Sequence, residues 1–121
     1  FTCRPELLGS FGMVSSTHWL ASSAGMSILE KGGNAFDAAF AAGMVLQVAE
    51  PHLNGPGGDL PLIIYSAKNK KTKVICGQGS APAKANIEFY KSQGLNLIPS
   101  NGLLSTVIPG AFDAWMLIMY T

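Results

Sequence analysis

The sequence predicts an α+β fold, in which helices are layered on an antiparallel sheet. Two helical patterns follow each other between residues 17 and 50, and a short glycine turn joins them. Two β-rich runs, 60–65 and 73–76, flank a polar turn and are typical of an antiparallel hairpin. Two further helical patterns, 86–93 and 109–119, complete the order. Helices that precede and follow a hairpin indicate the α+β class.

The chain before the first helix carries weaker signals. Phe1–Ser10 is expected to be an irregular lead-in, and Phe11–Ser16 is a candidate for a short strand. Ser16 or Thr17 is then expected to cap the first helix. The small and apolar residues of this helix recur at the spacing of one buried face: Ala21, Ala24, Gly25, Ile28 and Leu29.

The second helix is the central element, and both of its ends are marked in the sequence. Asn34 is a good N-cap, because its side-chain oxygen can accept from a free backbone N–H of the first turn. Asp37 lies three residues later, where its carboxylate can reach back to the cap. Gly32 and Gly33 suit the left-handed end of the preceding helix. Pro51 ends the central helix, because the residue before a proline leaves helical geometry.

The central helix is apolar on nearly all sides. One face carries alanines with Val45 and Leu46, and another carries Phe36, Phe40 and Met44. Such a helix is buried in a large protein or in a membrane. The apolar run is shorter than the ~20 residues that a bilayer requires. We therefore expect a buried helix of a soluble protein.

The second half of the chain combines a hairpin with shorter elements. Pro61 is expected at the start or edge of its strand, because proline cannot donate to a sheet ladder. The lysine-rich segment 68–71 is expected to be a solvated turn. Asn86 is predicted to cap a helix that runs to Gln93, with a long irregular connection over 96–108 before the last helix.

Composition suggests that more protein covers this chain. Of its 121 residues, 48% are hydrophobic and 12% are charged, about half of the ~25% charged residues in ordinary domains. An unusually apolar monomer is the alternative. The chain reaches Tyr120 and Thr121 inside an apolar run, so we expect the N-terminal piece of a longer chain.

A net charge of +1 offers no electrostatic argument for nucleic acid or an anionic membrane as partner.

The two cysteines bear on the compartment. Cys3 and Cys76 have neither metal-ligand spacing nor a disulfide-rich context, so both are expected to be free thiols. Free thiols favour a reducing compartment, and we expect a cytoplasmic protein. The first residues lack the basic start and apolar core of a signal peptide, although a processed start would leave export open.

Few residues of this chain point to chemistry by pattern alone. The run 55–58, Gly-Pro-Gly-Gly, has the composition of an anion nest, but it opens no helix and lacks the lysine of a phosphate loop, so tight turns are favoured. His18 and His52 have no partner for a dyad or a metal site and are expected in loops or caps. Trp19 and Trp115 are expected to be core anchors. We expect no metal site.

Several motifs together resemble one family. The run Gly32–Ala39, Gly-Gly-Asn-Ala-Phe-Asp-Ala-Ala, resembles a signature of the γ-glutamyltranspeptidase family. The segments 12–16, 50–58 and 81–85 resemble further family segments in the same order. The resemblance implies part of the four-layer αββα fold of N-terminal-nucleophile (Ntn) hydrolases. Residues 1–121 would be the incomplete, N-terminal part of a single domain, within the large subunit.

The resemblance also implies a catalytic group outside this chain. In the family the nucleophile is a threonine, freed at the N-terminus of a small subunit by self-cleavage of the zymogen. Its α-amine activates the hydroxyl as a base. Thr121 has no adjacent free amine, so no catalytic residue is expected in this chain. The implied partners are the remainder of the large subunit, the small subunit and a small-molecule amide substrate, with no cofactor.

One substrate-binding position is implied by the resemblance. In transpeptidases an arginine shortly before the Ala-Pro motif grips the α-carboxylate of the γ-glutamyl group. The matching position here, counted back from Ala81, is Gln78. Glutamine offers a neutral amide in place of a charged, bidentate grip. Three functions stay open: a γ-glutamyltransferase or hydrolase of glutathione metabolism, an amidohydrolase of the same family without γ-glutamyl specificity, and an inert structural or interaction fragment.

Overall fold

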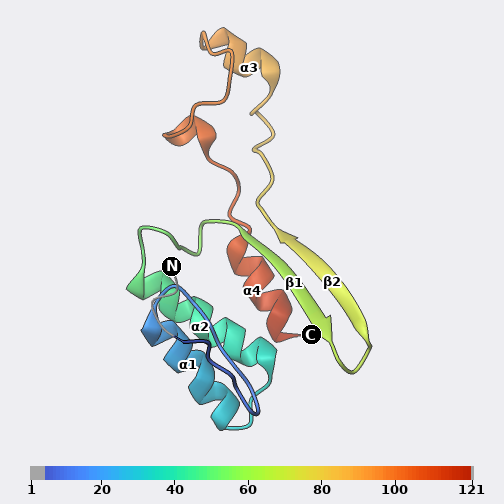
Figure 1. Cartoon of the computed structure of the whole chain (residues 1–121). Coiled ribbons are helices and arrows are strands. Elements are labelled where there is room, and N and C mark those ends of the chain that lie inside the picture. Colours follow the sequence, from blue (N-terminus) through green and yellow to red (C-terminus); the bar gives the residue numbers. More distant parts are fainter. Residues whose placement is uncertain (1–4, 121) are drawn as a thin grey trace. The chain divides into compact units, whose positions relative to one another are not determined.

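The computed structural model describes residues 5–120, which form helices and one two-stranded sheet (Figure 1). Predictions that concern Phe1–Arg4, among them the free thiol of Cys3, and those on Thr121 lie outside the described residues. The chain divides into two compact units, one up to Gly55 together with the residues from Leu117 onward, and one from Pro56 to Met116. The elements follow in this order: α1 (Trp19–Glu30), α2 (Ala35–Ala49), β1 (Leu60–Ser66), β2 (Lys71–Gly77), α3 (Ile87–Ser92), the 3₁₀ turn η1 (Leu103–Ser105) and α4 (Ala111–Met119).

The cap of α1 differs from the prediction. His18 is the N-cap, and its Nδ1 accepts a hydrogen bond from the backbone N–H of Leu20 at 3.2 Å. Ser16, one of the two expected caps, instead donates to the carbonyl oxygen of His18 at 2.7 Å. Thr17, the other, donates to the carboxylate of Glu50 at the end of α2. The hydroxyls of Ser16 and Thr17 thus bind other groups, and the imidazole of His18 accepts the N-cap hydrogen bond.

The N-terminus of α2 has the predicted capping box. The side-chain oxygen of Asn34 accepts from the backbone N–H groups of Phe36 and Asp37, at 2.7 and 3.0 Å. The carboxylate of Asp37 accepts in turn from the N–H of Asn34 at 3.0 Å. Gly32 has a φ of 88°, the left-handed conformation expected for the end of α1. Glu50 is the C-cap of α2, directly before Pro51, as predicted.

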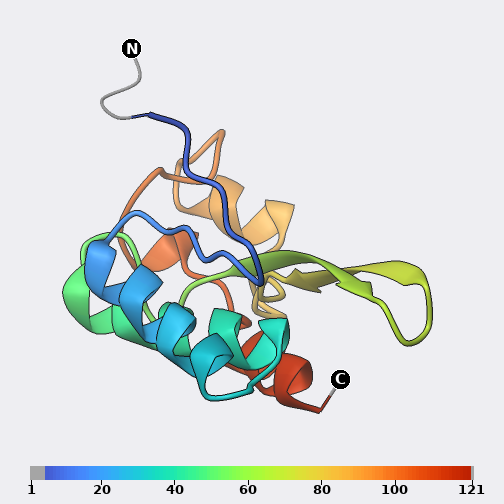
Figure 2. The same ribbon diagram turned by 60° about the horizontal axis from the view of Figure 1, so that its bottom comes forward.

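Helices α1 and α2 lie side by side and pack through small residues (Figure 1, Figure 2). Ala21 and Gly25 of α1 are buried, as are Ala38 and Ala42 of α2. A Cβ placed on Gly25 would lie 3.0 Å from the carbonyl oxygen of Ala38, so the two backbones approach closely there. The predicted buried face of α1 is therefore confirmed at Ala21 and Gly25, whereas Ala24, Ile28 and Leu29 are half-buried.

The expected strand at Phe11–Ser16 is wrong. Burial alternates residue by residue along this segment, as it does in a strand. However, the described residues place no neighbouring strand beside it, and a strand exists only through hydrogen bonds to a neighbour. The segment packs against α1 instead, where the Val14 side chain lies against Gly25.

Strands β1 and β2 form the predicted antiparallel hairpin, with Leu60 opposite Gly77 and Ser66 opposite Lys71. Pro61 is the second residue of β1, at the strand's start as expected. Lysines 68, 70 and 71 are exposed around the turn. Ile64 and Ser66 are buried on one face of β1. Pro61, Ile63 and Tyr65, on the opposite face, are exposed.

The remaining helices follow the sequence signals closely. Asn86 caps α3 by accepting from the N–H of Phe89 at 2.9 Å, and Gly94 ends this helix with a φ of 74°.

Trp115 of α4 is half-buried, whereas Trp19 is 71% exposed and stacks on His18. Trp19 is therefore not the expected core anchor within the described chain. No helix among residues 5–120 is long and apolar enough to cross a membrane.

Candidate functional site

Gln78 lies on the loop that follows β2, one residue beyond the end of the strand at Gly77. Its side chain is exposed. Within residues 5–120, its side chain makes one hydrogen bond, in which Oε1 accepts from the thiol of Cys76 at 3.8 Å. Cys76 is itself exposed and free. An exposed neutral amide keeps both donor and acceptor capacity for a ligand.

The backbone beneath Gln78 is held by a second segment of the chain. The N–H of Ile108 donates to the carbonyl oxygen of Ser80 at 2.9 Å. At the crossing, a Cβ on Gly79 would overlap the carbonyl group of Ile108. The segment just before α4 therefore runs directly against the backbone of the Gln78 loop.

A third segment completes this arrangement. The carbonyl oxygen of Gly58 accepts from the N–H groups of Gly110 and Ala111, at 3.4 and 3.1 Å. It thereby supplies an acceptor to N–H groups at the start of α4, which have no partner within the helix. Gly110 also faces the Gln78 loop: a Cβ there would lie 2.5 Å from the Gly77 carbonyl oxygen and 2.8 Å from the carbonyl carbon of Gln78. We call the meeting of residues 58–60, 77–80 and 108–111 the glycine junction.

The sequence signals for Gln78 and for the glycine junction differ. Gln78 is at the position implied by the family resemblance, and its role in binding stays a prediction. The junction was not expected, because it brings together three segments that are far apart in the sequence. The sequence signal that was present is a glycine in each of the three segments, and at Gly77, Gly79 and Gly110 the close backbone approach requires the absence of a Cβ.

The other candidates have structural roles. His18 caps α1, which confirms its expected place in a cap, and His52 is exposed in the turn after α2. The hydroxyls of Ser16 and Ser22 lie 2.7 Å apart and share a hydrogen bond. The loop around Gly55 and Gly57 leaves open space where each Cβ would be. Among residues 5–120, no group of three or more His, Cys, Asp or Glu side chains is placed to hold a metal ion.

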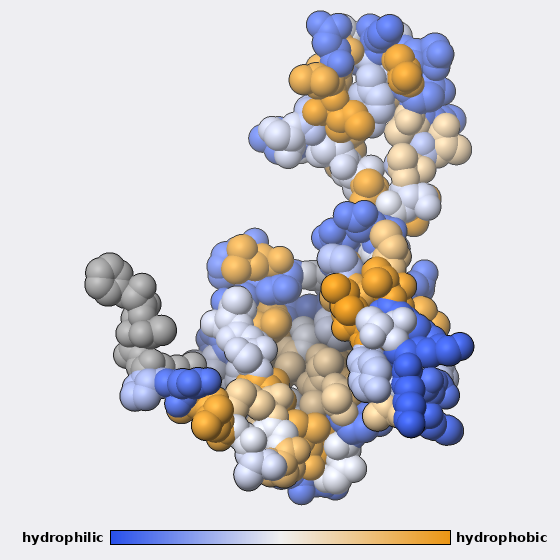
Figure 3. All heavy atoms as spheres, turned by 45° about the vertical axis from the view of Figure 1, so that its right-hand side comes forward, coloured by the Kyte–Doolittle hydropathy of each residue, from blue (hydrophilic) through white to orange (hydrophobic). Residues whose placement is uncertain are grey.

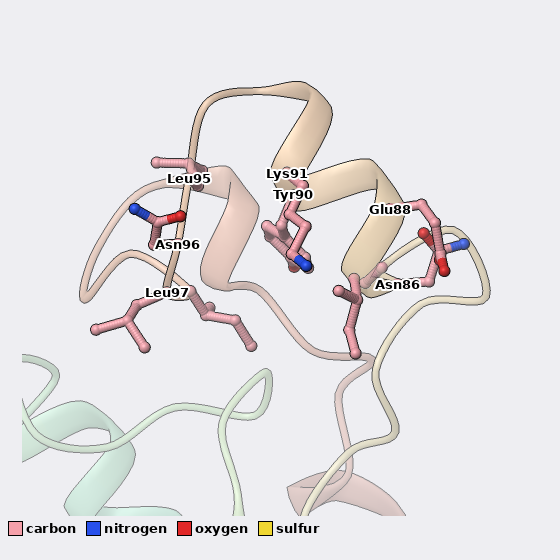
Figure 4. Close-up of a pocket in the computed structure, with 10 residues that line it drawn as sticks. Asn86, Glu88, Tyr90, Lys91, Leu95, Asn96 and Leu97 are labelled. Atoms are coloured by element: carbon pink, nitrogen blue, oxygen red, sulfur yellow. The ribbon is translucent and has the colours of Figure 1, made fainter.

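A separate pocket lies between α3 and the chain that follows it (Figure 4). Its volume is about 390 Å³, and Leu95, Leu97 and Ile98 contribute much of its apolar lining. Lys91 and Glu88 of α3 supply charges. The pocket is lined by ten residues, all between Ala85 and Ile98, and does not include Gln78. The sequence does not predict this pocket, since an irregular connection carries no periodic pattern.

Comparison with known proteins identifies the family. The family model of Gamma-glutamyltranspeptidase matches residues 21–120. The chain is 41% identical over 111 residues to the glutathione hydrolase-like YwrD proenzyme of Bacillus subtilis. This alignment covers 91% of this chain and 21% of that protein. It is 37% identical over 126 residues to the acylase ACY 1 proenzyme of a Pseudomonas strain, covering 95% and 22% of the two chains. The chain thus spans about a fifth of the length of these relatives.

Solved structures agree with the sequence comparisons. A structure of LmbA2991T421A is 57% identical and superposes with a TM-score of 0.89, over 98% of this chain and 20% of the other. The gamma-glutamyltranspeptidase of Helicobacter pylori is 31% identical with a TM-score of 0.84, over 96% of this chain and 34% of the other. The α+β fold expected from the sequence is that of the matching part of these Ntn hydrolases. The chain belongs to the gamma-glutamyltranspeptidase family, whose members here include hydrolases and acylases made as proenzymes.

Proposed function

We propose that residues 1–121 are the N-terminal part of the large subunit of an Ntn hydrolase or acyltransferase that cleaves γ-glutamyl or related amide bonds. The protein that contains this chain is called the parent enzyme below. The observation that carries the proposal is the family match over residues 21–120. The proenzyme names of the relatives support maturation by cleavage.

The proposed reaction has two steps. A threonine at the N-terminus of a small subunit, outside this chain, attacks the carbonyl carbon of the amide through its hydroxyl oxygen. The α-amine of that threonine takes the hydroxyl proton, the C–N bond breaks, and the amine product leaves with a proton. Water or a second amine then attacks the resulting ester and receives the acyl group. In this scheme the chain described here contributes scaffold and one wall of the donor site.

The intact masses of the purified parent enzyme test this proposal. We expect two chains, of which the smaller begins with threonine, and turnover of a γ-glutamyl anilide by the pair. The 121-residue chain produced alone should be inactive, because it lacks the nucleophile. A native protein that consists of a lone 12.7 kDa chain without amidase activity would instead support the inert structural or interaction fragment.

A second candidate is an amidohydrolase of the same family without γ-glutamyl specificity, and Gln78 favours it. If the donor site were built for the α-carboxylate of glutamate, glutamine in place of arginine would forfeit a charge-assisted hydrogen bond. Such a bond contributes about 1.5–3 kcal/mol, which is roughly a tenfold to hundredfold change in affinity. Natural turnover of γ-glutamyl donors should then be weak.

The substitution Gln78→Arg separates the two candidates in the parent enzyme. The assay measures kcat/KM for γ-glutamyl anilide and divides it by kcat/KM for 4-aminobutyryl anilide, which lacks only the α-carboxylate. We expect Gln78→Arg to raise this ratio roughly tenfold to hundredfold. Gln93→Arg adds the same charge at the exposed end of α3 and should leave the ratio unchanged. High γ-glutamyl activity in the unsubstituted enzyme, with no gain in Gln78→Arg, would contradict a specificity role for Gln78.

A further inference from the structure

The loop that carries Gln78 is held from both sides by backbone contacts. On its N-terminal side, Gly77 is the last residue of β2 and pairs with Leu60 of β1. On its C-terminal side, the carbonyl oxygen of Ser80 accepts from the N–H of Ile108. Gln78 lies between these two attachment points, so its backbone cannot move far without breaking one of them.

Gly110 and Gly79 make the close approach in the glycine junction possible. The contacts that a Cβ at either residue would make are with backbone atoms, which cannot rotate away as a flexible side chain can. At Gly110 these contacts include Gln78 itself. Gly57 lies one residue before the junction, and a Cβ there meets nothing within 4 Å. The requirement for glycine is therefore specific to the crossing.

We propose that Gly79 and Gly110 are positioning residues that set where the Gln78 amide stands in the donor site, and thereby the selectivity among amide donors. This inference rests on the proposed function. A Cβ on Gly110 would lie 2.8 Å from the carbonyl carbon of Gln78, whereas carbon atoms in contact are about 3.5–4.0 Å apart. The loop must therefore shift by roughly 1 Å, and a misplacement of about 1 Å can cost about 10²-fold in rate.

A double-mutant cycle in the parent enzyme tests the inference. The variants are Gln78→Arg, Gly110→Ala, the two combined, and Gly57→Ala combined with Gln78→Arg as the matched control. The readout is the ratio of kcat/KM between γ-glutamyl anilide and 4-aminobutyryl anilide. We expect Gly110→Ala to abolish most of the tenfold to hundredfold gain given by Gln78→Arg. The control should keep that gain in full.

The ratio separates positioning from general damage. A purely structural defect lowers kcat/KM for both donors alike and leaves the ratio of the Gln78→Arg background unchanged. A gain that persists in the combined Gln78→Arg and Gly110→Ala variant overturns the inference and leaves the proposed function standing. The absence of any gain from Gln78→Arg alone contradicts the role of Gln78, and the inference falls with it.

A measurement without substitutions covers the case in which Gly110→Ala does not fold. In the unsubstituted parent enzyme, the amide hydrogens of Ile108, Gly110 and Ala111 should exchange slowly, because each donates to a carbonyl oxygen of the junction. The amide of Gly57, which donates to no backbone carbonyl of residues 5–120, is the internal reference. Exchange of the three amides at the rate of an open loop would mean that the junction is not rigid, and this result also overturns the inference.

Discussion

Gly32 lies in the turn between the two N-terminal helices, with a φ of 88° and no atom within 4 Å of the position where a Cβ would be. A side chain would meet no neighbouring atom here, so only the left-handed backbone conformation requires glycine. Asn34 acts over an equally short range, since its partners are two and three residues away. Positions of this kind are determined by the chemistry of a few neighbouring residues.

The turn offers a clean comparison between two glycines. Gly32→Ala should weaken the α1–α2 turn by about 1–2 kcal/mol, because a residue with a Cβ is strained in the left-handed conformation. Gly55→Ala is the matched control, since Gly55 also has open space and no left-handed φ. It should be neutral or stabilising by about 0.4–1 kcal/mol. The measurement is hydrogen exchange of the α2 amides in the parent enzyme. Equal effects of both substitutions would contradict the argument from φ.

Helices α1 and α2 pack closely against each other, and their packing depends on small residues at the contact. At Gly25 a Cβ would lie 2.9 Å from Val14 Cγ1 and 3.0 Å from the Ala38 carbonyl oxygen. The side chain of Val14 can adjust, but a helix carbonyl cannot. The alanines on one face of α2, among them the buried Ala38 and Ala42, therefore allow the two helices to approach closely.

A large side chain at Gly25 should separate these helices. We expect Gly25→Leu to lower the free energy of local opening of α1 and α2 by about 1–3 kcal/mol through overpacking, in spite of the better helix propensity of leucine. Ser23→Leu, on the exposed side of α1, is the control and should cost little. Hydrogen exchange of the α1 and α2 amides is the measurement. Unchanged protection in Gly25→Leu would show that the interface can expand without cost.

Taken as a whole, the described chain buries mainly small residues. No large side chain among residues 5–120 is fully buried, and the buried apolar residues are Ala21, Ala38, Ala42, Ile64, Ala111, Ala114 and Ile118. Many large apolar side chains are exposed, among them Leu8, Val48 and Leu103. Apolar residues are visible at the surface in Figure 3 as orange spheres. Alanines contribute little burial energy, since the gain scales with the apolar area buried, at about 25 cal/mol per Å².

The 121-residue chain produced alone should therefore lack a cooperative fold. Exposed apolar patches larger than a few hundred Å² mark interfaces or aggregation sites. We expect strong binding of a dye that reports exposed apolar surface, and no sharp calorimetric transition. The parent enzyme is the control and should show the opposite behaviour. A monodisperse monomer of the short chain with a sharp melt would mean that this segment forms a sufficient core by itself.

Elements whose signals are local could be predicted from the amino-acid sequence. The ends of α2 and α3 were predicted because the N-caps, Pro51 after α2 and Gly94 after α3 act within three residues. The hairpin was predicted because its two runs flank a polar, lysine-rich segment, expected to turn at 68–71; the structure turns at 67–70. The start of α1 was predicted less well, since the contacts of Ser16 and Thr17 with other groups left the cap to His18.

Features that depend on partners far away in the sequence could be seen only in the folded chain. The segment Phe11–Ser16 has the alternation of a strand but packs against a helix, because no described strand lies beside it to complete the hydrogen bonds. The glycine junction joins residues about 50 positions apart in the sequence, from Gly58 to Gly110. A glycine that permits a close crossing looks the same in the sequence as a glycine in an open loop such as Gly57. The difference is the backbone that lies across from it, and only folding brings that backbone there.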